Sequence, residues 1–101
     1  MTLSKKQVKQ LRALANSLKP LIIIGKQDLS DSVVAQVNEV LEDHELVKGK
    51  ILDGSGLDAK EAALTLAQTL NADVVQTIGN RFIIFRRSKK KTIKHIDLVR
   101  E

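Results

Sequence analysis

Apolar residues recur along this chain with two periods, one typical of helices and one typical of strands. The first helical stripe follows Ser4 and ends before Pro20, and Gln7 completes a capping-box signature with Ser4. Two further helical stripes begin after Ser30 and Asp58, residue types that cap helices by accepting hydrogen bonds from the first backbone N–H groups. The spacing predicts helices over about residues 5–18, 31–45 and 59–70.

Four shorter segments have the spacing of strands. Leu21–Ile24 is a continuous apolar run, whereas residues 46–52 alternate between apolar and polar positions. Residues 74–78 and 81–87 flank Gly79-Asn80, a two-residue hairpin signal, and the last segment is apolar on both faces, as in an interior strand. The order αβαβαββ predicts a single α/β (α+β) domain, a four-stranded mixed sheet packed by helices.

The composition is that of a small globular protein. A length of 101 residues suits one domain with a single core, with 43% hydrophobic and 29% charged residues. Cysteine is absent, which excludes disulfides and suits a reducing cytoplasm. The longest apolar run, four residues, is far below the ~20 of a membrane span, and the N-terminus lacks an apolar signal core. We expect a cytoplasmic monomer without membrane contact.

The domain itself is expected over residues 1–88, with a basic C-terminal tail over residues 89–101. In the tail, Ile93, Ile96 and Val99 recur at near-helical intervals. This spacing predicts a short helix docked on the domain.

Charge is distributed unevenly around the net value of +5. Residues 1–26 contain six Lys or Arg and no acid, residues 27–73 contain three basic and ten acidic residues, and residues 74–101 contain eight basic and two acidic residues. Cationic ends around an acidic middle favour a polyanionic partner on one side of the molecule. A merely solubilising surface is the alternative interpretation.

The stretch after the first predicted strand has the composition of a phosphate-binding turn. Gly25 and Lys26 follow the apolar run, and a helix begins shortly after them at Ser30. Glycine allows close backbone approach, and the unpaired N–H groups and dipole of a helix N-terminus favour an anion. A simple strand-to-helix turn is the alternative. The preceding helix adds a basic stripe without an acid at i+4 to pair with it: Lys5, Lys9 and Arg12.

Residues suited to catalysis are sparse. The chain has no Cys, Trp or Tyr, and His44 and His95 lack a paired carboxylate motif or metal-ligand spacing. The Gly25-Lys26 pair lacks the upstream glycine of a Walker loop, and Gln27 stands where Ser or Thr would hold magnesium. We therefore expect no enzyme, cofactor, metal or small-molecule substrate. With two phenylalanines, both expected in the core, RNA contact should fall mainly on phosphates and ribose.

The segment LSKKQVKQLRALANSLKPLIIIGKQDLSDSVVAQVNEVLEDHELVKGKI resembles the YhbY-like CRM domain, the chloroplast RNA splicing and ribosome maturation module. The resemblance continues through VVQTIGNRFIIFRR and covers about residues 2–87, and its most specific parts are the LKP-strand-IGK and HELVK segments. It implies a stand-alone bacterial protein that associates with precursors of the large ribosomal subunit. It also implies a fold similar to the C-terminal domain of bacterial translation initiation factor three.

Members of this family have a GxxG loop, likened to the KH-domain loop that clamps a nucleic-acid backbone. The resemblance places this loop at residues 25–28, where Gly25 is kept and Asp28 replaces the second glycine. A carboxylate that faces phosphates is repulsive, but Asp also suits turns and left-handed backbone angles. The family usually has a β-branched residue where this chain has Gly49, and glycine inside a strand indicates a bulge or a close backbone approach.

The resulting hypothesis is a non-enzymatic RNA-binding protein that acts in assembly of the large ribosomal subunit, with ribosomal RNA as its partner. The residues expected to contact RNA are Gly25, Lys26, Gln27 and Asp28 of the loop, Lys5, Lys9 and Arg12 of the first helix, Lys48 and Lys50 if their sheet face is uncovered, and a second cationic region of Arg86, Arg87, Lys89, Lys90 and Lys91. Two alternatives remain, a protein-binding adaptor that uses the acidic segment Glu39–Glu45 and a DNA-binding domain.

Overall fold

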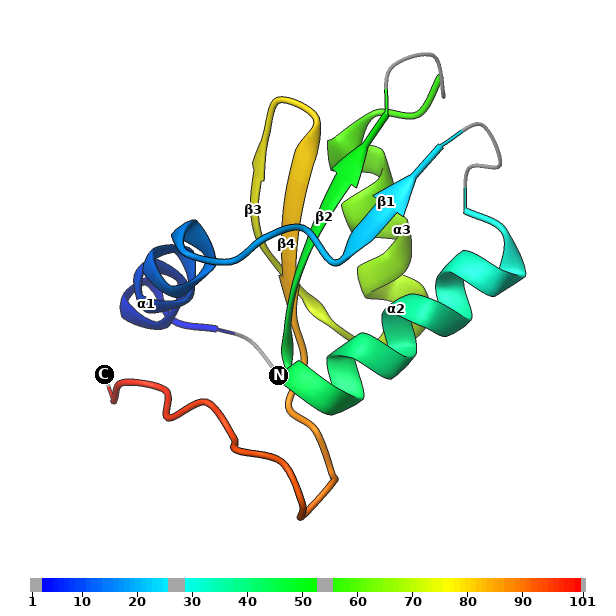
Figure 1. Cartoon of the computed structure of the whole chain (residues 1–101). Helices are drawn as coiled ribbons and strands as arrows, with labels where there is room; N and C mark the ends of the chain where they lie inside the picture. Colours follow the sequence, from blue (N-terminus) through cyan, green and yellow to red (C-terminus); the bar gives the residue numbers. More distant parts are fainter. Residues whose placement is uncertain (1–2, 26–28, 53–55, 101) are drawn as a thin grey trace.

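Three helices and a four-stranded sheet form the part of the protein that the structure describes (Figure 1). The computed structural model describes residues 3–25, 29–52 and 56–100. In chain order, the elements are α1 (Lys5–Asn16), β1 (Ile22–Ile24), α2 (Asp31–His44), β2 (Leu46–Ile51), α3 (Ala59–Leu70), β3 (Asp73–Ile78) and β4 (Arg81–Phe85). The predicted order αβαβαββ and the α+β class are confirmed.

The helices begin where the capping residues predict. Ser4 and Gln7 exchange both hydrogen bonds of a capping box, Gln7 N donating to Ser4 Oγ at 3.1 Å and Ser4 N to Gln7 Oε1 at 3.0 Å. Ser30 and Asp58 accept from backbone N–H groups in the first turns of α2 and α3. Asn71 ends α3 in a left-handed conformation, which asparagine tolerates.

The sheet has the strand order β1-β2-β4-β3. β1 pairs with β2 in parallel, and β4 pairs antiparallel with both β2 and β3, so the sheet is mixed as predicted. Because β4 lies between two strands and beneath packed elements on both faces, Phe82–Phe85 is buried throughout. The expectation of an interior strand at this place is confirmed.

The helices cover the two faces of the sheet unequally (Figure 1). On one face, α2 and α3 pack with residues of all four strands in the larger core cluster. On the opposite face, Leu11 and Ala15 of α1 pack with Leu46, Ile83 and Phe85 in a smaller cluster. One helix thus covers the second face, and it leaves part of that face to solvent.

Residues 86–100 form neither helix nor strand, and their last part runs along α1. Gln10 of α1 holds the backbone of this segment, since its Nε2 donates to Asp97 O at 2.6 Å and its Oε1 accepts from Val99 N at 2.8 Å. Leu98 packs beside the smaller core cluster. The short helix expected here is therefore replaced by irregular chain, because α1 supplies partners for backbone groups that a helix would bond internally.

Gly49 lies where a side chain does not fit. It pairs with Phe82 of β4, and a Cβ atom on Gly49 would come within 2.2 Å of that ring. The close approach expected from the sequence is thus present, and β2 itself pairs without interruption. The irregularity of the sheet lies instead in β3, between Val74 and Gln76.

Substituting Gly49→Ala is expected to destabilise the domain by about 1–3 kcal/mol, because the methyl group must displace the packed Phe82 ring. Urea unfolding followed by circular dichroism measures the change. The matched control is Gly25→Ala, whose Cβ would meet Leu52 Cδ1 at an ordinary 3.6 Å. A Gly49→Ala/Phe82→Leu variant should regain part of the loss, and a Gly49→Ala midpoint equal to that of the parent would contradict this account.

Candidate nucleic-acid interface

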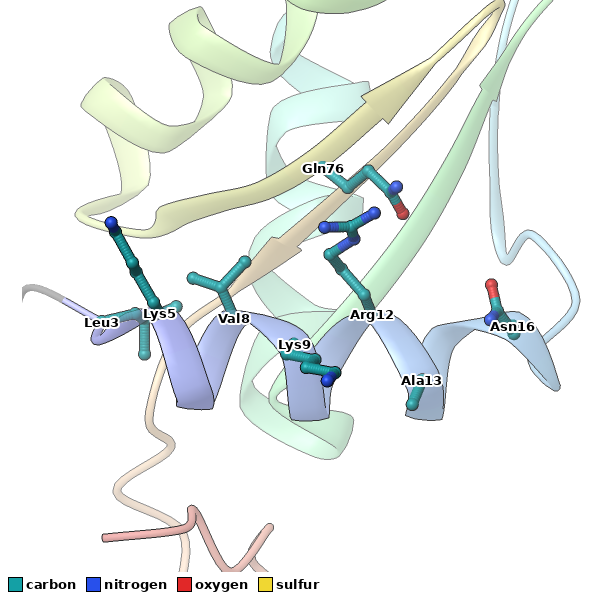
Figure 2. A pocket seen from close by; sticks show the side chains of 8 residues that line it. All are labelled: Leu3, Lys5, Val8, Lys9, Arg12, Ala13, Asn16 and Gln76. Atoms are coloured by element: carbon teal, nitrogen blue, oxygen red, sulfur yellow. The ribbon is translucent and has the colours of Figure 1, made fainter. Parts of the chain in front are cut away.

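A cationic stripe lines a hollow beside α1 (Figure 2). We call Lys5, Lys9 and Arg12, all exposed, the α1 stripe. The hollow has a volume of about 740 Å³, and its other lining residues are Leu3, Val8, Ala13, Asn16 and Gln76. None of these eight residues is acidic, so no carboxylate of the lining competes with an incoming anion for the α1 stripe.

Gln76 of β3 fixes the Arg12 side chain against the sheet (Figure 2). With its amide oxygen facing α1, Gln76 accepts from Nε and Nη2 of Arg12 at 3.1 Å each. The irregularity of β3 makes this contact possible, because Val75 packs in the core under α1 while Gln76 pairs with Ile83 and lies on the same side. The bulge thus turns Gln76 toward α1, where it holds the Arg12 side chain at the junction of the helix and the sheet.

One cross-strand row of the same sheet face is exposed beyond α1. This exposed row consists of register partners on β1, β2, β4 and β3, namely Ile23, Lys50, Arg81 and Ile78. Ile23 is 58% exposed and Ile78 63% exposed, Arg81 is exposed, and Lys50 is half-buried. The condition placed on Lys50, an uncovered sheet face, is therefore met at this row.

Lys48 lies on this face too, but it stabilises α1. Its Nζ donates to Ala15 O at 3.1 Å and to Leu18 O at 3.2 Å, so it satisfies carbonyl groups at the C-terminal end of the helix. A second hollow, of about 140 Å³, joins this end of α1 to the exposed row, and its lining residues are Asn16, Lys48, Gln76, Ile78, Arg81 and Ile83.

Only the first residue of the predicted glycine-lysine loop is described. The other three lie outside the described residues, and their phosphate contacts stay a prediction: Lys26, Gln27 and Asp28. Gly25 directly follows β1, the strand that contributes Ile23 to the exposed row. Beyond the loop, Ser30 caps α2 and accepts from Val33 N at 3.3 Å.

The second cationic region, after β4, is largely paired with acids of α2. Arg86 Nη2 lies 3.1 Å from Glu42 Oε1, and its Nη1 donates to Leu70 O at 2.9 Å. Lys90 pairs with Asp43, and because each stabilises the other's charged form by this hydrogen bond, the pKa of Asp43 is lowered and the pKa of Lys90 is raised. All three lysines of this region are exposed, Lys89, Lys90 and Lys91, and Lys90 is so within its ion pair.

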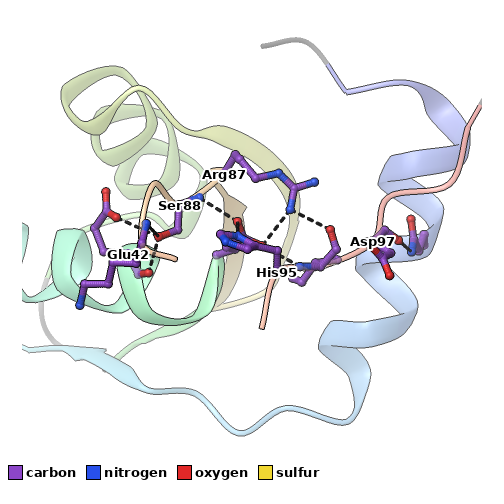
Figure 3. Close-up of polar contacts among 9 residues, drawn as sticks. Glu42, Arg87, Ser88, His95 and Asp97 are labelled. Carbon is purple, nitrogen blue, oxygen red and sulfur yellow. Dashed lines mark hydrogen bonds and ion pairs between the residues drawn. The ribbon is translucent and has the colours of Figure 1, made fainter. Parts of the chain in front are cut away.

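A buried carboxylate, that of Glu45, connects this region to the C-terminal segment. Figure 3 labels three of the residues that bond to it, Arg87, Ser88 and His95. The Glu45 oxygens accept from four donors: Ser88 N at 2.7 Å, Ile96 N at 2.7 Å, His95 Nδ1 at 2.9 Å and Arg87 Nη1 at 3.0 Å. Because an ionised carboxylate only accepts, His95 Nδ1 bears the shared proton. Burial raises the pKa of Glu45, but the hydrogen bonds from His95 and the backbone, with the charge of Arg87, outweigh it and lower the pKa below its usual value.

Three contributors to these sites were not identified from the sequence. Arg81 belongs to no motif, and its alignment with Lys50 depends on strand pairing. Gln76 reaches Arg12 only because of the bulge in β3. Glu45 was counted with an exposed acidic segment, yet it is fully buried. None of the three has a local signal in the sequence, because each contact depends on strand pairing or on a segment far along the chain.

Residues 3–25, 29–52 and 56–100 meet neither the requirements of a metal site nor those of a membrane-spanning helix. Within these ranges, no group of three or more His, Cys, Asp or Glu side chains is arranged to hold a metal ion. The same ranges contain no helix with the length and apolar character needed to cross a bilayer.

Comparison with known proteins gives one consistent match. Residues 3–86 match the model of the CRS1 / YhbY (CRM) domain. The Probable RNA-binding protein YqeI of Bacillus subtilis is 34% identical over 96 residues, which cover 95% of this chain and 98% of that protein. The Probable RNA-binding protein PA4753 of Pseudomonas aeruginosa is 31% identical over 90 residues, or 89% and 86% of the two chains. The solution structure of SAV1595 from Staphylococcus aureus has a TM-score of 0.74 at 34% identity, covering 94% of this chain and 100% of that chain.

Replacing Glu45→Gln is expected to release the C-terminal segment and to lower the free energy of unfolding by about 2 kcal/mol, because charge-assisted hydrogen bonds are lost. Since folding lowers the pKa of Glu45, its contribution is complete above the usual glutamate pKa of about 4.3 and is lost as the pH falls through the lower folded value. Hydrogen exchange at Ser88 and Ile96 N–H, and urea unfolding at a series of pH values, measure both effects.

The matched control for this substitution is Glu39→Gln, which changes an exposed residue of α2, the helix that Glu45 follows, and should leave exchange and stability unchanged. Equal protection of Ser88 and Ile96 N–H in the Glu45→Gln variant and the parent would refute the proposed role of this carboxylate.

Proposed function

This chain belongs to the CRS1 / YhbY (CRM) domain family, and we propose that it binds RNA phosphates through the α1 stripe and the two cations of the neighbouring exposed row, Lys50 and Arg81. The observation that supports this most directly is that the three cations of the α1 stripe lie on the same side of the sheet as Lys50 and Arg81. They lie beside hollows whose described lining residues include no carboxylate. A polyanion is the partner that such a surface attracts. Relatives along nearly the whole chain are named as RNA-binding proteins.

The spacing of the α1 stripe suits a sugar-phosphate backbone. Successive cations of the stripe are four and three residues apart in the sequence, so they are separated by about 6 Å and about 4.5 Å along the helix axis. A nucleic-acid strand that runs beside α1 meets them in turn, and Lys50 and Arg81 extend the contact over the sheet. Gln76 reduces the freedom of Arg12 and so lowers the entropic cost of binding.

Within this function, we propose that the RNA is ribosomal RNA in precursors of the large subunit, and that the protein assists assembly in the cytoplasm by binding rather than by catalysis. The resemblance to the RNA splicing and ribosome maturation module supports this choice. A surface that contacts mainly phosphates also suits the recognition of a folded RNA by its shape. The backbone N–H groups of Lys26, Gln27 and Asp28, with the Lys26 ammonium group, belong to this proposal as a further phosphate contact after β1.

The adaptor hypothesis, which uses the acidic segment Glu39–Glu45, receives less support. Three of its four acids, Glu42, Asp43 and Glu45, are paired with cations of this same chain. A basic partner protein would have to displace these internal contacts. We therefore favour RNA.

A Lys9→Ala/Arg12→Ala variant should bind ribosomal RNA more weakly, because two phosphate contacts are lost. The slope of log affinity against log salt should fall by about 1.5, at roughly 0.7–0.9 for each phosphate contact. Filter binding across a salt series measures affinity and slope together.

The matched control, Lys60→Ala/Lys94→Ala, removes the same charge from α3 and the C-terminal segment, outside the two hollows. It should retain a slope close to that of the parent. Equal losses in the two double variants would indicate attraction by net charge alone and would refute the α1 stripe as the site.

In sucrose gradients of cell extract, the protein should sediment with large-subunit precursors, and the Lys9→Ala/Arg12→Ala variant should move to the light fractions. Ribonuclease digestion should release the parent from the particles, because the contact is to RNA. Retention after digestion would instead favour the adaptor hypothesis.

A further inference from the structure

We propose that the exposed row packs against unpaired bases, so that the RNA recognised is a duplex interrupted by a bulge or loop. This inference depends on the proposed function and specifies the class of RNA that the same surface takes. In this arrangement, the α1 stripe contacts the phosphates of a flanking strand, and the exposed row receives the nucleotides that leave the stack.

The first observation is the apolar character of the row. Ile23 and Ile78 are the two most exposed of the large apolar side chains in the described part of the chain, at 58% and 63%. They lie at opposite ends of the row and flank Lys50 and Arg81. At about 4.8 Å between strands, the row spans about 14 Å, which is room for more than one nucleotide.

Phosphate binding does not account for these isoleucines. A continuous A-form helix presents phosphates, ribose hydroxyls and base edges to a protein, and its apolar base faces are hidden by stacking. Unpaired bases present those faces, which aliphatic side chains cover well and on which an arginine guanidinium stacks. The row has both groups side by side, Arg81 next to Ile78.

The second observation is the hollow of about 140 Å³ beside the row. Asn16 and Gln76 line it next to Arg81, and their amides donate and accept hydrogen bonds as base edges do.

Charge selects RNA over an apolar protein segment as the occupant. The row and the hollow contain Lys48, Lys50 and Arg81 and, among their described residues, no carboxylate. The row also continues toward the α1 stripe through Gln76, which lines both hollows. An occupant must therefore combine flat apolar groups with repeated negative charge, as single-stranded nucleotides do.

The test compares two RNA probes, a continuous duplex and the same duplex with a short bulge that contains 2-aminopurine. The parent should bind the bulged probe about fivefold more tightly, and the 2-aminopurine fluorescence should change on binding because the base changes its stacking partner. An Ile23→Thr/Ile78→Thr variant keeps β-branching and every charge. It should lose the preference and the fluorescence change while its affinity for the continuous duplex and its salt slope stay at parent values.

The matched control, Leu64→Ala, truncates an exposed leucine of α3 and should behave as the parent. Urea unfolding checks that the threonine variant is folded, and if it is not, Ile78→Thr alone serves in its place. This inference would be overturned if the parent bound both probes with equal affinity, or if the threonine variant lost affinity for both probes to the same extent. Either result would leave the proposed function intact. A parent that binds neither probe would overturn the proposed function. A threonine variant that keeps the preference and the fluorescence change would show that the row does not meet the bases.

Discussion

The packing of α1 across one end of the sheet determines where this protein can meet a partner. Leu11 and Ala15 are fully buried on that face, and a buried leucine side chain contributes about 2 kcal/mol. Lys48 fixes the C-terminal end of the helix through two carbonyl groups. A helix is about 10 Å wide, whereas a six-residue strand such as β2 is about 20 Å long, so one helix cannot cover the whole face. The remainder stays open with Lys50 and Arg81 in it.

Glu45 determines where the C-terminal cationic segment lies and which of its cations are paired. A buried carboxylate is stable only when donors surround it, and here they come from Arg87, His95 and two backbone N–H groups of the C-terminal segment. These contacts bring the segment beside the acids of α2, where Arg86 and Lys90 also find partners. The positive charge is therefore distributed unevenly over the surface. The cations of the α1 stripe line an open hollow, whereas several cations of the C-terminal segment form ion pairs with acids of the same chain.

The bulge in β3 connects the two parts of the proposed interface. It turns both Val75 and Gln76 toward α1, so that one side chain extends the core and the other meets Arg12. Without the extra residue, alternation along the strand would send one of them to the opposite face. A single backbone irregularity thus joins the α1 stripe to the exposed row, and in the proposed complex it would give the RNA strand one continuous path from phosphate contacts to base contacts.

The sequence by itself determined the elements and their order, because capping residues, apolar periodicity and the Gly79-Asn80 hairpin act over a few residues. It also determined the α1 stripe, since residues four and three apart on a helix share a face whatever that helix packs against. Tertiary structure alone decided which cations are open and which are paired. Lys50 aligns with Arg81, and Lys48 with the end of α1, through strand register and helix placement, and Glu45 is buried by a segment some fifty residues away. These relations depend on contacts between distant parts of the chain, which local spacing does not encode.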